Sequence, residues 1–234
     1  MTGFVAKTLV TGLVVAGFTS QRPLPFLQKD KVITYSSYVK SPGDKVNQYS
    51  TIVEIETVSS SDLYSHSAGT VRFEGSSDDN DYRYKQEFSS DSFAFYASGR
   101  NHIYDRVADN YTKLKLDLMD SLQYPFQMKV GDTLRSCISK FTISVGESKS
   151  KSVMSFTNRY VVKLDTLNLP IGKITAWKIE AEMTNKSVAS AYGSSKKETV
   201  SCKLYEWFNA DYGIVKSERE IEGVFTSVEL KSIK

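Results

Sequence analysis

The sequence is poor in the residues that carry most catalytic and metal chemistry. Its 234 residues include two histidines, two cysteines and five prolines. His66 and His102 stand alone, without the HExxH or similar spacing that binds zinc, so we expect structural or surface roles for both. A Gly-x-Ser-x-Gly elbow, a phosphate-binding loop and a dinucleotide fingerprint are also missing from the sequence. These absences predict a protein without catalytic residues, cofactor or bound metal.

An excess of charge of one sign is lacking as well. The chain has 30 basic and 27 acidic residues, which leaves a net charge of +3. Such a balance provides no general attraction to nucleic acid or anionic lipid. The basic runs Lys149–Lys151 and Lys196–Lys197 look like loop tips, and they lack the interleaved aromatics that stack on bases. We therefore expect no nucleic-acid partner.

Long apolar runs are absent except near the start of the chain. Lys7 precedes the apolar stretch Thr8–Phe18, and the polar break Thr19–Arg22 follows it. This pattern predicts a signal peptide over residues 1–20 and export across the inner membrane, to the periplasm. The stretch is shorter than the roughly 20 residues of a membrane span, so the protein is expected not to span the membrane. The alternative is a buried strand or helix of the folded domain.

What the sequence does have is alternation of apolar and polar residues. Segments such as Tyr49–Thr57, Tyr82–Phe88 and Leu114–Leu118 concentrate their apolar and aromatic side chains at alternate positions. About eleven such strands predict one all-β domain over residues 21–234, a large antiparallel sheet rolled into a partial barrel or sandwich. Helix is limited to one or two turns near Tyr104–Asn110. The polar segment Lys186–Thr199 is expected to be a mobile loop.

Carboxylates are plentiful, but their spacing favours solvated strand faces. Glu54 with Glu56, and Glu180 with Glu182, resemble the acid pair of a glycosidase, yet residues two apart on a strand belong to one face. The acidic run 78–81 offers oxygens for calcium but lacks the ligand spacing of an EF-hand. We therefore interpret this run as a polar hairpin loop.

The two cysteines leave two alternatives open. Cys137 and Cys202 both fall on predicted core faces of strands. In an oxidising compartment they could form a disulfide, provided that their Cα atoms lie within about 7 Å of each other. Otherwise they are buried thiols that pack as small apolar side chains.

A series of turn and aromatic landmarks runs through the second half of the chain. Pro125 sets a bend, Gly131 with Asp132 predicts a tight turn, and Trp177 and Trp207 are expected to be buried. The segments that carry these landmarks resemble a family of exported bacterial proteins of unknown function, the TapB-like group: Tyr124–Leu134, Leu169–Ala176 and Trp207–Lys216, with Tyr35–Tyr38 in the opening hairpin. The resemblance implies a YmcC-like fold, loosely similar to lipoprotein carriers, and it implies no catalytic residues.

Two non-catalytic functions remain. A rolled sheet with an apolar concave face can bind a hydrophobic ligand or lipid, a reading that the aromatic residues Phe93, Phe95 and Tyr96 favour. The alternative is an envelope assembly or interaction protein that binds protein or polysaccharide partners through sheet edges and loops.

Overall fold

The computed structural model describes residues 28–43, 46–60, 64–74, 82–89, 92–95, 112–118 and 120–234. Within these residues the chain forms thirteen β-strands and no helix. The predicted signal peptide (residues 1–20) and the helical turns expected near Tyr104–Asn110 lie outside the described residues.

The strands differ widely in length. The first seven are β1 (Val32–Lys40), β2 (Val46–Ser60), β3 (Tyr64–Glu74), β4 (Tyr82–Ser89), β5 (Ser92–Phe95), β6 (Thr112–Leu118) and β7 (Leu122–Pro125). The other six are β8 (Cys137–Val145), β9 (Ser148–Leu169), β10 (Gly172–Ala191), β11 (Ser194–Asn209), β12 (Gly213–Ile221) and β13 (Val224–Ile233).

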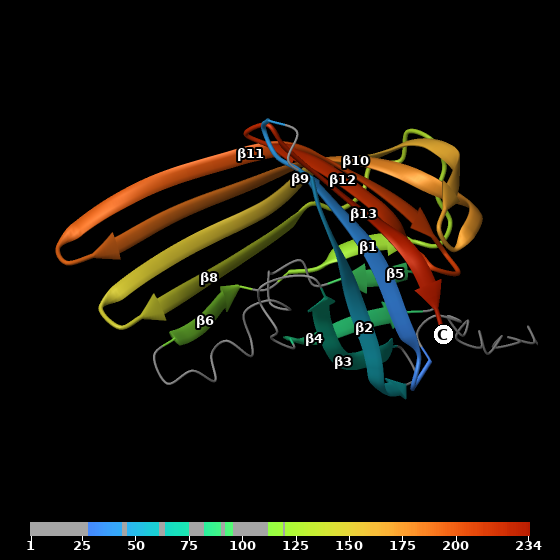
Figure 1. The fold of residues 1–234 in the computed structure, drawn as a ribbon, viewed down its shortest axis with the longest axis horizontal. Helices are drawn as coiled ribbons and strands as arrows, with labels where there is room; N and C mark the ends of the chain where they lie inside the picture. Colours follow the sequence, from blue (N-terminus) through green and yellow to red (C-terminus); the bar gives the residue numbers. More distant parts are fainter. Residues whose placement is uncertain are drawn as a thin grey trace, which may run out of the picture.

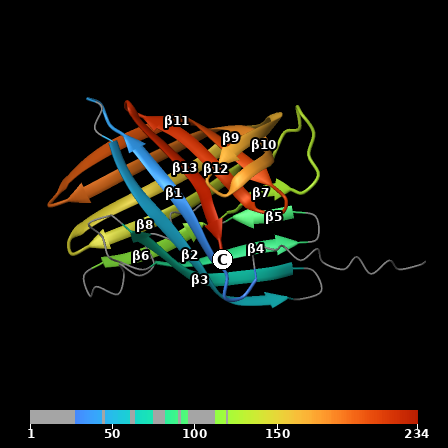
Figure 2. The same ribbon diagram turned by 45° about the vertical axis from the view of Figure 1, so that its right-hand side comes forward.

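All thirteen strands belong to one antiparallel sheet in the order β6-β8-β9-β10-β11-β12-β13-β1-β2-β3-β4-β5-β7. The sheet is strongly twisted, so that β2 to β4 cross beneath the long strands (Figures 1 and 2). Its edges, β6 and β7, are not paired with each other, so the sheet is open. The all-β prediction is confirmed. The strand count is thirteen rather than about eleven, because β5 and β7 have four residues each, too few to show alternation.

The longest strands form an arm that projects to one side of the molecule (Figure 1). We call residues 138–155 and 184–201 of β8 to β11 the arm. Tyr192 and Gly193 form the turn between β10 and β11, with positive φ angles of 49° and 79°, as in the primed turns that match strand twist. The prediction of a mobile loop over Lys186–Thr199 is therefore wrong, and the basic runs Lys149–Lys151 and Lys196–Lys197 lie on strands. Both faces of this hairpin are polar, which removes the alternation that identifies strands.

The hydrophobic core lies on one face of the sheet. Phe208 of β11 is its centre, with the ring of Tyr124 stacked at 5.2 Å and that of Phe126 at 6.3 Å between centroids. Other fully or nearly fully buried members come from strands far apart in the sequence: Ile33, Val161, Ile179, Ala181, Val215 and Leu230. Short β7 is thus held to the sheet by side chains across the core as well as by its pairing with β5.

A buried polar cluster lies within this core and consists of Tyr124, Arg159 and Glu206. The Tyr124 hydroxyl contacts both carboxylate oxygens of Glu206, at 2.9 and 2.8 Å. The Arg159 guanidinium lies over the Tyr124 ring at 4.9 Å and donates to the backbone carbonyls of Gln123 and Arg135. The exposed fraction is 0% for Tyr124 and Arg159 and 7% for Glu206. The cluster therefore joins β7, β9 and β11 in a region closed to water.

A β-bulge directs Arg159 into the core. Between the pairs Glu180↔Tyr160 and Glu182↔Thr157, β9 has one residue more than β10. Asn158 takes the extra position with φ of 49°, a conformation that asparagine tolerates better than most residues. Its side-chain amide donates to Glu182 at 2.8 Å, which holds the bulge open on the outer face. Arg159 consequently faces inward, although strict alternation from Phe156 would place it outside.

The predicted turn at Gly131 and Asp132 and the predicted burial of Trp207 are confirmed. Gly131 has φ of 88°, and the backbone amide of Asp132 donates to the carbonyl of Lys129 at 3.1 Å. Trp207 is 4% exposed, and its indole N–H donates to Asp165 at 3.3 Å. Trp177 is half-buried and packs against the edge of the core.

Replacing the hydroxyl of Tyr124 tests the buried polar cluster. Tyr124→Phe keeps the stacked ring but removes the donor to Glu206, so we expect the free energy of unfolding to fall by about 1–3 kcal/mol. Urea denaturation measures this change. Tyr205→Phe is the matched control, because no hydrogen bond of its hydroxyl is described, and it should stay within about 0.5 kcal/mol of the wild type. Equal effects of the two variants would contradict the role of the cluster.

Glu206 also predicts an unusual pH dependence. Burial raises its pKa above the ordinary value of 4.5, although Arg159 and the Tyr124 hydroxyl act in the opposite direction. The folded protein then holds this proton to higher pH than the unfolded chain, so stability falls as pH rises above about 4.5 through the raised pKa. The Glu206→Gln variant has no titratable group at this position, so it does not lose stability in this way as pH rises. The stability of the wild type relative to Glu206→Gln should decrease with pH in urea titrations, and a constant or increasing difference would refute the assignment.

Candidate functional site

A concave site formed entirely by described residues lies on the face of the sheet opposite the core. It is a groove of about 330 Å³ formed by β1, β2, β12 and β13. Two adjacent rows of cross-strand neighbours make its floor, because residues paired directly across antiparallel strands share a face. The first row is Gln48, Tyr38, Ser227 and Glu218, the second is Ser36, Glu229 and Lys216, and Phe225 completes the lining.

Lys216 is the charged centre of the groove. Its ammonium lies 2.8 Å from the Glu218 carboxylate and 2.9 Å from that of Glu229. It also lies over the ring of Trp207 at 5.4 Å, the neighbouring residue on β11. Burial opposes the charged form of Lys216, but the two carboxylates outweigh burial and raise its pKa. The lysine therefore stays protonated at neutral pH and fixes both carboxylates at the floor of the groove.

One end of the groove is aromatic. The rings of Tyr38 and Phe225 meet edge to face, with centroids 6.4 Å apart. Beside them Ser227 is 7% exposed, and its hydroxyl has no hydrogen-bond partner among the described residues. A buried hydroxyl without a partner is energetically costly, and this one belongs to a residue that lines the groove.

The local sequence explains why these side chains meet. The turn between β12 and β13 consists of Glu222 and Gly223, whose φ angles are 50° and 77°. A two-residue turn of this kind fixes the strand register, which brings Lys216 opposite Glu229. The partners from β1 arrive through a pairing between the two ends of the domain, which no short sequence pattern reveals.

The predicted cysteine pair is separated by two strands. Cys137, Phe156, Met183 and Cys202 form one row across β8, β9, β10 and β11. Three strand spacings put the cysteines roughly 14 Å apart, beyond the limit of about 7 Å for a disulfide. Both thiols are free. Burial raises the pKa of Cys137 to about 11 and also raises that of Cys202. In this fold Cys137 is a buried thiol and Cys202 a half-buried one, and their separation leaves no disulfide between them.

The other sequence candidates are distributed over the molecule. On the outer face Glu180 pairs with Lys203 at 2.7 Å, and Glu182 accepts from Asn158 at 2.8 Å, so each carboxylate has its own local partner. No group of three or more histidine, cysteine or acidic residues that could hold a metal occurs in the part of the chain that the structure describes. The acidic run 78–81 and His102 lie outside the described residues, as does the side chain of His66.

Sequence reasoning missed the groove and the buried cluster. Tyr38, Lys216 and Glu229 come from three strands whose adjacency depends on the pairing of β1 with β13. The sequence offers one signal for Arg159. The core residues Phe156 and Val161 are five positions apart, and this odd spacing within one strand indicates a bulge.

Fold and groove define an open all-β protein, and comparison with known proteins identifies its family. The model of the DUF3108-like family matches residues 31–222. The chain belongs to the DUF3108-like family. No curated protein was found to match it. The assignment to the narrower TapB-like group stays a prediction.

Two solved structures are similar to this chain. A protein from Bacteroides fragilis, described as exported and as having a YmcC-like fold, has a TM-score of 0.62 and 18% identity over 88% of this chain and 96% of its own. A protein from Parabacteroides distasonis, described as a lipoprotein, has a TM-score of 0.62 and 14% identity over 89% of this chain and 96% of its own. The expected similarity to the YmcC-like fold is confirmed. The described residues include no helix long and apolar enough to cross a bilayer.

The state of the cysteines can be measured directly. Titration with a thiol reagent under denaturing, non-reducing conditions should find two free thiols, whereas the native protein should react slowly because both groups are shielded and their pKa values are raised. Cys202→Ser should abolish one of the two reactive groups and provides the control. No reactive thiol after denaturation would contradict the arrangement.

Proposed function

We propose that this protein is an exported, non-catalytic binding protein whose groove takes a hydroxyl-rich ligand, such as a saccharide unit of an envelope polysaccharide. The observation that carries the proposal is the aromatic pair Tyr38 and Phe225 beside the unpartnered hydroxyl of Ser227. Aromatic rings accept the apolar face of a sugar, while hydroxyl, amide and carboxylate groups bond its hydroxyls. The groove volume of about 330 Å³ falls at the lower end of ordinary ligand sites.

Binding fits the electrostatics of the groove better than hydrolysis does. Glu218 and Glu229 both contact the same ammonium, that of Lys216. Glycosidases instead place their two carboxyl groups in contrasting environments, one of which raises a pKa to make an acid. A lysine shared by both carboxylates gives them equivalent surroundings and leaves their remaining lone pairs to accept hydrogen bonds.

Export is supported by the predicted signal peptide over residues 1–20. The two similar structures are those of proteins described as exported and as a lipoprotein, in agreement with this proposal. We propose a periplasmic location on these grounds.

A hydrophobic ligand inside the rolled sheet is the second candidate. The register places Phe93 opposite Tyr124 and Phe95 opposite Leu122, at the end of the sheet nearest the core. The side chains of Phe93 and Phe95, and the whole of Tyr96, lie outside the described part of the structure. Where the core is described, Tyr124 and Phe126 cover Phe208, so the protein's own side chains fill this region. Native mass spectrometry of the purified protein distinguishes the candidates, since a carrier would retain an apolar ligand.

Variants of the groove test saccharide binding. On an array of bacterial envelope glycans the wild type should bind a subset of oligosaccharides. Tyr38→Ala should weaken that binding about tenfold, because it removes the aromatic surface. Ser227→Ala should weaken binding without loss of folding stability, since it removes a buried hydroxyl that has no partner in the free protein.

Tyr212→Ala is the matched control, because Tyr212 is 36% exposed and does not line the groove. It should bind glycans as the wild type does. Absence of any glycan binding, or equal losses in Tyr38→Ala and Tyr212→Ala, would overturn the proposal.

A further inference from the structure

The outer face of the arm is a regular grid of residues. Four residues from each of β8, β9, β10 and β11 share this face, and the strand pairings align them in four rows. From the base of the arm to its tip the rows are Ile138, Ser155, Thr184 and Ser201; Lys140, Val153, Lys186 and Thr199; Thr142, Lys151, Val188 and Lys197; and Ser144, Lys149, Ser190 and Ser195. We call these sixteen residues the lysine face.

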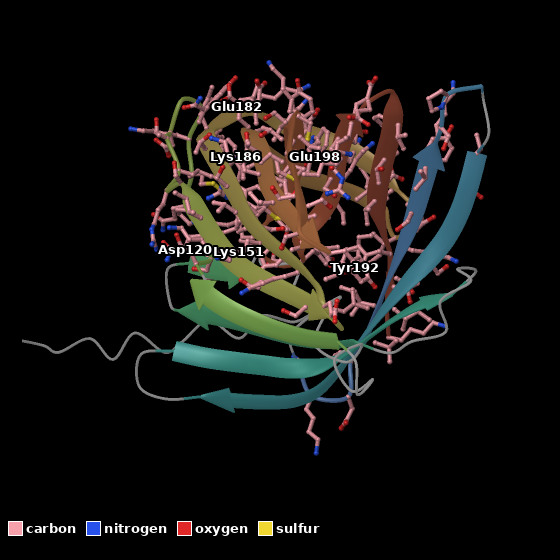
Figure 3. The ribbon with its side chains drawn as sticks, turned by 90° about the vertical axis from the view of Figure 1, so that its left-hand side faces the viewer. Asp120, Lys151, Glu182, Lys186, Tyr192 and Glu198 are labelled. Carbon is pink, nitrogen blue, oxygen red and sulfur yellow. The ribbon has the colours of Figure 1, made fainter. Side chains whose placement is uncertain are left out.

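The lysine face contains five lysines and no carboxylate. The lysines are Lys140, Lys149, Lys151, Lys186 and Lys197, and all are exposed. None of them forms an ion pair within the described part of the chain. Figure 3 views the molecule from the side of the arm, with Lys151 and Lys186 labelled.

Three other lysines on the same side of the sheet are paired with carboxylates. Lys203 pairs with Glu180 at 2.7 Å, Lys163 with Asp165 at 3.0 Å, and Lys216 with two carboxylates in the groove. On the opposite face of the arm, Lys196 lies 3.9 Å from Glu198. The five lysines of the lysine face therefore carry charge that no ion pair among the described residues compensates.

The spacing within the grid keeps the lysines apart. In the second row Val153 separates Lys140 from Lys186, and in the third row Val188 separates Lys151 from Lys197. No two lysines are direct cross-strand neighbours, which avoids the repulsion of like charges placed opposite each other. Val188 is 39% exposed, so an apolar side chain also reaches the surface between two ammonium groups.

We propose that the lysine face docks on the surface of an anionic phospholipid membrane. All four strands contribute lysines, spread over an area of roughly 14 by 20 Å. A linear polyanion is matched by a single row or groove of cations, whereas this two-dimensional array faces many headgroup phosphates at once. Exposed Val188 and Ile138, at 39% and 40%, suit the lipid interface, where apolar and cationic side chains bind together.

Attraction of this kind depends on distance and salt. Clustered lysines bind anionic membranes through their combined charge, each acting within about a Debye length of the surface. The near-neutral total charge of the chain does not cancel the attraction, because the lysine face itself contains no carboxylate.

Sedimentation with vesicles tests the proposal. The protein should bind vesicles of equal parts phosphatidylcholine and phosphatidylglycerol, bind phosphatidylcholine vesicles weakly, and dissociate as ionic strength increases. The triple variant Lys151→Gln, Lys186→Gln and Lys197→Gln should bind the anionic vesicles roughly 100-fold more weakly, because each lysine near the surface contributes about a fivefold factor.

A second triple variant controls for total charge. Lys129→Gln, Lys173→Gln and Lys231→Gln removes the same charge from exposed lysines outside the lysine face, and it should bind nearly as the wild type does. Circular dichroism verifies that both variants are folded. Unchanged binding by the first variant, or equal losses in the two, would overturn the proposal. Binding to soluble dextran sulfate but not to anionic vesicles would also overturn it, in favour of a polymeric partner.

Discussion

The contact between the Tyr124 hydroxyl and the Glu206 carboxylate fixes the arrangement of the sheet's edges. Strand β7 has only four residues and pairs with β5 alone, so side chains must hold it to the central strands. Tyr124 does so by stacking on Phe208 and bonding Glu206, while Arg159 holds the backbone of Gln123. Displacement of one side chain of the cluster would leave the other polar groups buried without partners. The cluster therefore favours a single position for β7. The other edge strand, β6, is constrained as well, because only three residues separate it from β7 in the sequence.

Sequence alternation predicted the fold wherever one face of a strand is buried and the other is solvated. The alternating segment Tyr82–Phe88 lies within strand β4, and Trp207 is buried as predicted. Alternation failed over Lys186–Thr199, where both faces meet water and nothing distinguishes them. It also failed to bring Tyr38 to Lys216, because cross-strand adjacency is a property of topology rather than of a local pattern. The spacing of the cysteines in the sequence likewise gave no measure of their separation across the sheet.

The distribution of charge carries more information than its sum. The net charge of +3 predicted no attraction to anionic surfaces. This sum does not show that charges are arranged differently around the groove and along the arm. Around the groove each lysine is matched by a carboxylate, as with Lys216 between Glu218 and Glu229. Along the arm such matches are absent from the outer face within the described residues. One side of a single sheet thus offers a hydrogen-bonding site with paired charges and a cationic platform.

The pairing of β1 with β13 determines the order in which the protein can fold. Ile33 lies opposite Ile233, 200 residues later, whereas β8 to β13 are joined by tight turns and contact their sequence neighbours. Local hairpins form rapidly, and closure of the longest loop comes at a greater entropic cost. Strands β8 to β13 can therefore assemble first, and β1 then pairs with the free edge of β13. The groove, whose walls come from both ends of the domain, exists only after this last pairing is made.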